Sequence, residues 1–174
     1  MYYHLRRFTN ASHSRILSRT TEWDGGDPPG GGKNVATLFT RIIDGEIPGH
    51  FVWRDDRCVA FLSIHPLRPG HTLVVSRAEV DHWLDLAPDL AAHLMTVAQS
   101  IGQALQQAFK PVKVGLMIAG LEVPHVHLHV VPIGGLHDLD FSRQDLNAKP
   151  ADLERAAETI RSTLRALGFS QVAN

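Results

Sequence analysis

The chain has 174 residues, of which 44% are hydrophobic and 20% are charged, and its formal net charge at pH 7 is −1. This length and composition predict one globular domain with a sizeable core, plus tails. The near-zero charge gives no global field that would attract nucleic acid or a membrane surface, and no apolar run reaches the roughly 18–20 residues of a membrane span. The single cysteine, Cys58, excludes an intramolecular disulfide and fits a reducing, cytoplasmic compartment.

Residues 1–36 are predicted to form a disordered extension and linker. Residues 1–21 contain four arginines and several Ser and Thr, and the first acidic residue is Glu22. That composition is typical of a mitochondrial transit peptide, and equally of a non-folding extension or of translation upstream of the true start. Residues 25–32 are rich in Gly and Pro, as linkers are.

Short apolar segments between turn residues then predict one helix and four strands. The expected bounds are 37–45 for the helix and 51–54, 58–62, 71–75 and 112–118 for the strands. In the helix, Leu38, Phe39 and Ile42 are expected to face inward, and Gly45 to end it.

Two further helices are indicated by hydrophobic residues at spacings of three and four. The longer one begins near Pro88 and continues to Phe109, and the second begins near Pro150 and closes at Gly168. Between them, His137, Asp138 and Asp140 lie in a loop; hydration is the simpler interpretation and a metal role the alternative. His50 and His65 are expected to be exposed at loop edges, and His93 to be an ordinary helix residue.

Three alternating histidines mark a fifth strand. His125, His127 and His129 are interleaved with Val126, Leu128 and Val130. Because successive side chains of a strand point to opposite faces, the imidazoles share one face and the aliphatic residues can enter a core. Pro124 and Pro132 bracket the run and predict a short strand, since proline donates no ladder hydrogen bond.

Three kinds of chemistry fit this row of histidines. Imidazole changes charge near neutral pH, so the row can serve acid–base or nucleophilic catalysis. Neutral imidazole is also a metal ligand, and two histidines at i and i+2 on a strand can reach one ion. A polar strand face turned to water is the third reading. The residues of the strand alone leave the three open.

The histidine strand resembles the signature of the histidine triad (HIT) family, His-x-His-x-His-x-x with apolar x. The likeness extends upstream to residues 38–48, 61–66 and 69–75 and covers about Thr37 to Pro132. It implies an α+β fold, a HIT-like domain with a five-stranded antiparallel sheet, covered on one side, one long helix and a C-terminal helix. The corresponding boundaries are 37–140 for the HIT domain and 141–174 for the C-terminal loop and helix.

The resemblance implies a nucleotide-binding hydrolase or transferase that cleaves a phosphoramidate or phosphoanhydride bond at a nucleotide α-phosphate. His127 would be the nucleophile that becomes nucleotidylated, and His129 would contact the phosphate and the leaving group. His125 and His71 would support the cluster. The alternatives are a nucleotide-binding module with little turnover, and a metal site built from these four histidines.

The resemblance also implies a purine nucleotide or nucleotide conjugate as ligand, no cofactor, and a homodimer of the Hint type. The nucleoside would lie in a mostly apolar slot. Its expected residues are Leu38, Phe39, Ile42, Ile47, Phe61, Ser63, Ile64, Leu73 and Glu122.

Four departures from the family pattern affect the shell that holds the substrate. Thr37 and Thr40 stand where the family often has Cys-x-x-Cys, so its occasional zinc site is not expected. Ser63 stands where an Asp usually holds the ribose, and Leu121 replaces the usual Gln before the triad. The loop before the triad is also shortened, to residues 117–120.

Overall fold

The computed structural model describes residues 36–173, so the predicted extension lies, apart from Ala36, outside the described residues. The helices are α1 (Leu38–Ile43), α2 (Pro88–Phe109) and α3 (Pro150–Ala166), and the strands are β1 (Phe51–Arg54), β2 (Cys58–Leu62), β3 (Thr72–Ser76), β4 (Lys113–Met117) and β5 (His127–Ile133). Short 3₁₀ turns cover Trp83–Asp85, Leu136–Leu139 and Phe141–Arg143. Within the described part of the chain, no helix has both the length and the apolar character to span a bilayer.

The strands form one antiparallel sheet in the order β1-β2-β3-β5-β4, which confirms the predicted fold class. The histidine strand β5 lies between β3 and β4, with His129 opposite Leu73 on one side and Met117 on the other. The β1 edge is covered by the end of the chain, through a bridge from Trp53 to Val172. Among the described strands, β4 pairs only with β5, so its outer edge is open.

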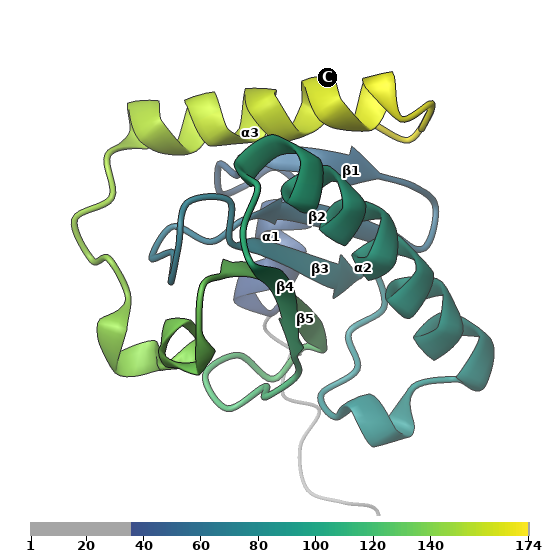
Figure 1. Ribbon diagram of the computed structural model, residues 1–174. Helices are drawn as coiled ribbons and strands as arrows, with labels where there is room; N and C mark the ends of the chain where they lie inside the picture. Colours follow the sequence, from purple (N-terminus) through teal and green to yellow (C-terminus); the bar gives the residue numbers. More distant parts are fainter. Residues whose placement is uncertain (1–35, 174) are drawn as a thin grey trace, which may run out of the picture. The chain divides into compact units, whose positions relative to one another are not determined.

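Helices cover both faces of the sheet, unequally (Figure 1). On one face α2 and α3 bury Leu94, Ile101 and Ile160, among others, against inward residues of the strands such as Leu128. On the other face the short α1 packs against Phe61 and its neighbours. The expectation of a sheet covered on one side was therefore incomplete. The second face is covered by α1 at one end and by the turn at Phe141–Arg143 near His129.

The structure corrects the predicted inward face of α1. Phe39 and Ile42 are 5% and 9% exposed, whereas Leu38 is 46% exposed. Phe39 and Ile42 lie about 60° apart around the helix and both meet the sheet, whereas Leu38 lies about 100° from Phe39, at the margin of that face. Thr37 caps the helix by accepting a hydrogen bond from the Thr40 N–H, and Gly45 follows its end with φ of 82°.

The histidine strand also differs from its predicted bounds. β5 continues through Pro132 to Ile133, and His125 lies in the turn before it. Pro132 is tolerated because β3 ends opposite Val130, so no β3 partner lies beside residue 132 to accept a ladder hydrogen bond. The alternation of the side chains is unaffected, and Val126, Leu128 and Val130 enter the core beneath α2.

Candidate active site

The structure gathers the four predicted catalytic histidines into one buried cluster. His127 and His129 come from β5, His125 from the turn before it, and His71 from the residue preceding β3. All four are at most 6% exposed. The ring centres of His127 and His129 lie 4.7 Å apart, and those of His71 and His129 lie 5.2 Å apart.

Hydrogen bonding defines which nitrogen of His127 carries the proton. Its Nδ1 lies 2.7 Å from the backbone carbonyl oxygen of His125. A carbonyl can only accept, so Nδ1 is the protonated nitrogen and donates. In the neutral ring, Nε2 therefore keeps a free lone pair, which is the form a nucleophile needs.

A second chain of hydrogen bonds defines the opposite arrangement at His129. The Leu67 N–H donates to His71 Nδ1 at 3.1 Å, so the neutral His71 ring carries its proton on Nε2. That Nε2 lies 3.0 Å from His129 Nδ1, which therefore accepts. The neutral His129 ring consequently has its proton on Nε2. The two rings of β5 thus differ in chemistry: His127 offers a lone pair at Nε2 and His129 offers an N–H.

Burial keeps His71, His127 and His129 uncharged at neutral pH. Desolvation, followed by the neighbouring His127, lowers the pKa of His71 to about 4. Desolvation, followed by His127 and His71, lowers the pKa of His129 to about 3. The pKa of His127 is also lowered, chiefly by burial, although its hydrogen bond to the His125 carbonyl opposes the shift. At neutral pH the lone pair of His127 is therefore available without deprotonation.

A cavity of about 380 Å³ opens beside α1 and reaches His127 and His129. All nine residues predicted for the nucleoside slot line it: Leu38, Phe39, Ile42, Ile47, Phe61, Ser63, Ile64, Leu73 and Glu122. The Phe39 ring meets the His127 ring edge to face, with centres 4.8 Å apart. The wall is apolar near α1 and polar near the histidines. This division suits a ligand with a flat apolar part and a polar part.

A smaller cavity of about 170 Å³ also reaches these two histidines. Residues 119–122, which precede the triad, form one wall, and Phe141 forms another. Phe141 also packs edge to face on His129 with ring centres 5.1 Å apart, and Gln144 reaches the larger cavity. Sequence analysis missed Phe141 and Gln144. The one available indication was an aromatic residue inside a polar loop shortly after the Gly134-Gly135 break.

The metal-site alternative is not favoured by this geometry. Both ring nitrogens of His71 and the Nδ1 nitrogens of His127 and His129 are already hydrogen-bonded to protein groups. Thr37 and Thr40, at the family's Cys-x-x-Cys positions, offer hydroxyls in place of the thiolates that zinc prefers. The Thr37 hydroxyl lies 2.7 Å from His125 Nδ1, so this corner is already hydrogen-bonded. The residues present do not fit the zinc site of the family.

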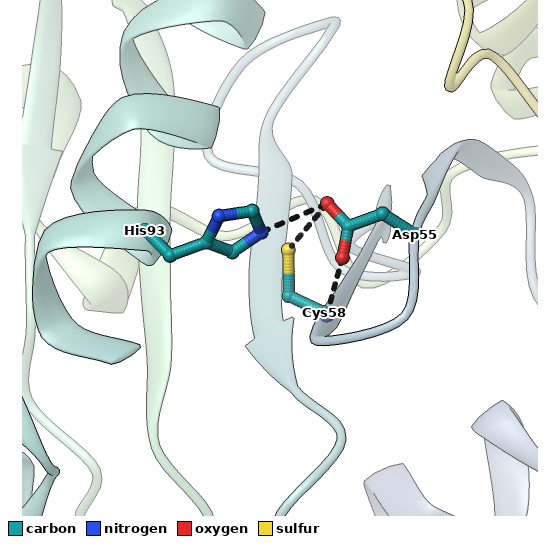
Figure 2. Close-up of side chains that lie close together, drawn as sticks. All are labelled: Asp55, Cys58 and His93. Carbon is teal, nitrogen blue, oxygen red and sulfur yellow. Dashed lines mark hydrogen bonds and ion pairs between the residues drawn. The ribbon is translucent and has the colours of Figure 1, made fainter. Parts of the chain in front are cut away.

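A second polar cluster lies on the α2 side of the sheet (Figure 2). The Asp55 carboxylate lies 2.9 Å from His93 Nε2 and 3.5 Å from Cys58 Sγ. Trp53 Nε1–H also donates to Asp55, at 2.8 Å. Although these three donor types suit a metal ion, their hydrogen bonds satisfy one another, so the cluster links the β1–β2 turn to α2. His93, predicted to be an ordinary helix residue, is therefore hydrogen-bonded to Asp55.

The remaining polar residues divide between loop structure and solvent. Asp138 is buried, where it accepts from the N–H groups of Gly134 and Gly135, and the hydrated-loop interpretation is wrong for it. The side chain of His137 is 62% exposed, as expected. His50 pairs with Glu154 at 2.7 Å, and the exposed His65 lines the larger cavity.

The fold and the site together define a class of protein. A five-stranded α+β domain presents an imidazole lone pair and an imidazole N–H side by side on one strand, at the end of an apolar cavity. The model of the HIT domain family matches residues 44–135, which include all five strands and the four histidines. The chain belongs to the HIT family, whose members are nucleotide-binding hydrolases and transferases.

Two relatives illustrate the range of the family. An uncharacterised HIT-like protein of Saccharolobus solfataricus is 36% identical over 100 residues, which are 55% of this chain and 72% of the relative. An asymmetrical bis(5'-nucleosyl)-tetraphosphatase of Schizosaccharomyces pombe is 32% identical over 99 residues, 54% of this chain and 53% of that enzyme. The chain therefore spans about half the length of the tetraphosphatase.

Solved structures show the same fold. A zinc-bound histidine triad family protein from Mycobacterium smegmatis matches with a TM-score of 0.65 and 28% identity, over 75% of this chain and 94% of that one. A hypothetical histidine triad nucleotide-binding protein from Sulfolobus tokodaii matches with a TM-score of 0.65 and 27% identity, over 74% of this chain and 92% of that one.

Proposed function

We propose that this protein cleaves a nucleotide conjugate at the α-phosphate through a nucleotidyl intermediate on His127. The observation that carries the proposal is the pair of complementary tautomers in the cavity wall. The bond from His127 Nδ1–H to the His125 carbonyl leaves a lone pair on Nε2, and the bond from His71 leaves an N–H on His129 Nε2. A nucleophile and a hydrogen-bond donor stand side by side, and both are uncharged at neutral pH.

The reaction has two steps. In the first, the His127 Nε2 lone pair forms a bond to phosphorus while the bond from phosphorus to the leaving group breaks. The leaving atom takes up a proton from solvent as its bond to phosphorus breaks, so an amine leaves as the amine. The His129 Nε2–H keeps its proton and hydrogen-bonds to the leaving atom or to a phosphoryl oxygen, and the His125 carbonyl stabilises the positive charge on His127. In the second, water or another acceptor attacks phosphorus and releases a proton to solvent, the P–N bond breaks and His127 recovers its lone pair. Water makes the protein a hydrolase, and another acceptor makes it a transferase.

The larger cavity is the place for the nucleoside. Its apolar end, between Phe39, Ile42 and Phe61, offers flat apolar walls to a purine base. Ser63 lies where the family usually has an Asp, and its hydroxyl can bind a ribose hydroxyl without charge. The sugar is then held less firmly than by a carboxylate.

The charges of the site favour an amine as leaving group. Glu122 lines both cavities, and among the described residues no Lys or Arg lines either one. A polyphosphate leaving group would bring several negative charges beside this carboxylate without a cation to offset them. A protonated amine is instead attracted to the Glu122 carboxylate. The phosphoramidate is therefore favoured over the phosphoanhydride that the name of the fission yeast relative indicates for that protein.

The test compares the protein with its His127→Asn variant on two substrates, an adenosine 5'-phosphoramidate and a dinucleoside tetraphosphate. The unaltered protein is expected to turn over the phosphoramidate faster and to show a nucleotidyl adduct by mass spectrometry after brief incubation. The variant should bind nucleotide but form no adduct, because only the lone pair is lost. Wild-type turnover by His127→Asn would overturn the mechanism.

Nucleotide binding with little turnover is the second candidate function. Ser63 in the sugar position favours it, and so does Leu121, which is 94% exposed where the family has a polar Gln. In the same experiment this function predicts nucleotide affinity without an adduct in the unaltered protein. The adduct therefore separates the two candidates.

A homodimer is proposed through α2 and β4. The outer edge of β4 is unpaired within the described chain, and a groove of about 900 Å³ runs between this edge and α2. The groove exposes Met95 and Leu116, which are 48% and 43% exposed. Open strand edges flanked by apolar side chains are sites of pairing with a second chain. A second copy would extend the sheet across this edge.

A further inference from the structure

His125 is held from three directions, more firmly than the other histidines of the cluster. Its Nε2 lies 2.7 Å from the Ser76 carbonyl oxygen, and its Nδ1 lies 2.7 Å from the Thr37 hydroxyl. The next peptide is also anchored, because the Val126 N–H donates to the Val80 carbonyl at 2.7 Å. The ring is 0% exposed. Segment 76–80 and the start of α1 therefore clamp this residue between them.

The hydrogen bonds continue from His125 to a carboxylate at the surface. The Thr40 backbone N–H donates to the Thr37 hydroxyl oxygen at 3.2 Å, and the Thr40 hydroxyl donates to Glu79. Glu79 also accepts from the Thr37 backbone N–H at 2.8 Å. The Thr40 bond, followed by the Thr37 N–H, holds the pKa of Glu79 below its usual value. The carboxylate is thus tied to both threonines.

The Ser76 carbonyl determines the tautomer of His125. Because a carbonyl can only accept, Nε2 carries the proton, and the Nδ1 of the neutral ring accepts from the Thr37 hydroxyl. The Thr37 hydroxyl thus donates to His125 and the Thr40 hydroxyl donates to Glu79. Both ring nitrogens of His125 are hydrogen-bonded, which fixes the orientation of the ring.

We propose that Thr37, Thr40 and Glu79 are positioning residues that act through His125 to hold His127 in its nucleophilic tautomer. This inference rests on the proposed function of His127. The His125 carbonyl accepts the His127 Nδ1–H at 2.7 Å, so its direction decides where the proton of His127 resides. The three residues occupy the corner where the family's Cys-x-x-Cys positions fall. In this chain, hydroxyls and a carboxylate hold His125 there, and no metal is needed to do so.

The test uses Thr37→Val, which removes the hydroxyl at nearly constant volume, and Thr37→Ser, which restores it. Glu79→Gln keeps an acceptor oxygen and removes the charge, and Thr40→Val removes the hydroxyl that donates to Glu79. Glu46→Gln is the matched control. Glu46 is an exposed acid that pairs with Arg41 of α1, and its side chain bonds to none of the three proposed positioning residues. Thermal unfolding of each variant shows the temperature range in which it is folded.

Two readouts separate positioning from a merely structural role. The first is the ¹⁵N chemical shift of the His127 ring nitrogens, which reports the tautomer without any substrate. The second is the split between kcat and KM with an adenosine 5'-phosphoramidate. Thr37→Val is expected to give a mixture of His127 tautomers and to lower kcat roughly tenfold with KM within about twofold. Loss of the correct tautomer in a catalytic triad lowers kcat by up to ~10⁴. A smaller effect is expected here, because Thr37 acts on His127 only through His125.

Thr37→Ser should restore both readouts, and Glu79→Gln and Thr40→Val should fall between the two. Glu46→Gln should match the unaltered protein. A wild-type His127 tautomer in folded Thr37→Val would overturn the positioning role, whatever the activity. The proposed function fails separately, if His127→Asn keeps its turnover.

Discussion

At the scale of single residues, Ser63 is the point where this site holds its ligand least firmly. Its hydroxyl donates to the His65 carbonyl at 3.1 Å and is left with lone pairs facing the larger cavity. Ser63→Asp would supply charged acceptors for a ribose diol, and hydrogen bonds to charged groups contribute roughly 1.5–3 kcal/mol. Solvent access reduces this, so kcat/KM for a ribonucleotide phosphoramidate should rise about tenfold.

A 2',3'-dideoxy substrate is the control for this prediction. It offers the new carboxylate no hydroxyl to bind, so its kcat/KM should not improve. Steady-state kinetics of both substrates with both proteins measures the difference. Equal effects on the two sugars would place the ribose elsewhere in the cavity.

His71 and His129 make stability depend on pH. Their pKa values of about 4 and 3 in the folded protein lie below the ordinary value of 6.5, so the unfolded chain binds more protons between these limits. The contribution of the two neutral rings to the free energy of unfolding is therefore fully present above pH 6.5. It is lost as the pH falls from 6.5 toward 4 for His71 and toward 3 for His129. Each histidine contributes about 1.4 kcal/mol per pH unit within this window.

Urea unfolding at pH 7 and pH 5 measures this effect. The free energy of unfolding should fall by roughly 3–4 kcal/mol between the two, an interval in which ordinary carboxylates change little. A flat profile between pH 7 and 5 would show that the two rings are not held neutral.

At the scale of elements, Asp55 joins the β1–β2 turn to α2. It accepts from the backbone N–H groups of Arg57 and Cys58, each at 2.8 Å, and pairs with His93 on α2 (Figure 2). Burial acts to raise its pKa, but the bonds from Trp53, Cys58, Arg57 and His93 outweigh it and lower the pKa to about 2. The carboxylate is thus ionised and fully hydrogen-bonded at neutral pH.

Asp55→Ala should destabilise the protein by about 2–4 kcal/mol, because several donors lose their acceptor together. His93→Leu, which removes one of these bonds, should cost about 1 kcal/mol. Urea unfolding gives both values, and phosphoramidate turnover per folded molecule should be unchanged because the cluster lies on the face opposite the cavity. Equal losses in the free energy of unfolding for the two variants would show that Asp55 does not connect the β1–β2 turn to α2 through several bonds at once.

At the scale of the whole molecule, the proposed dimer makes a prediction about β4. Leu116→Arg places a charge on the exposed edge, 43% exposed in the single chain, and should convert a dimer to a monomer. Leu146→Arg is the control, since Leu146 is 67% exposed and lies outside the groove. Sedimentation equilibrium measures both. A monomeric unaltered protein would contradict the proposal directly.

Local periodicity was sufficient for most of the fold. The β1 and β2 bounds agree with those expected from the apolar runs on either side of residues 55–57. The stripe from Leu94 to Leu105 is buried because its spacing of three and four places those side chains on one face of any α-helix. Alternation likewise put His127 and His129 on one face of β5. These patterns require only the neighbours of each residue in the chain.

The tertiary structure decided the contacts between segments that are far apart in sequence. His125 meets Thr37 across 88 positions, and His129 meets His71 across 58. Such pairs depend on how β3, β5 and α1 approach one another, which no local periodicity encodes. The same holds for Phe141, whose ring reaches His129 from a loop beyond the triad. The sequence alone therefore determined which histidines share one face of β5, and packing between the segments decided which nitrogen of each histidine carries the proton.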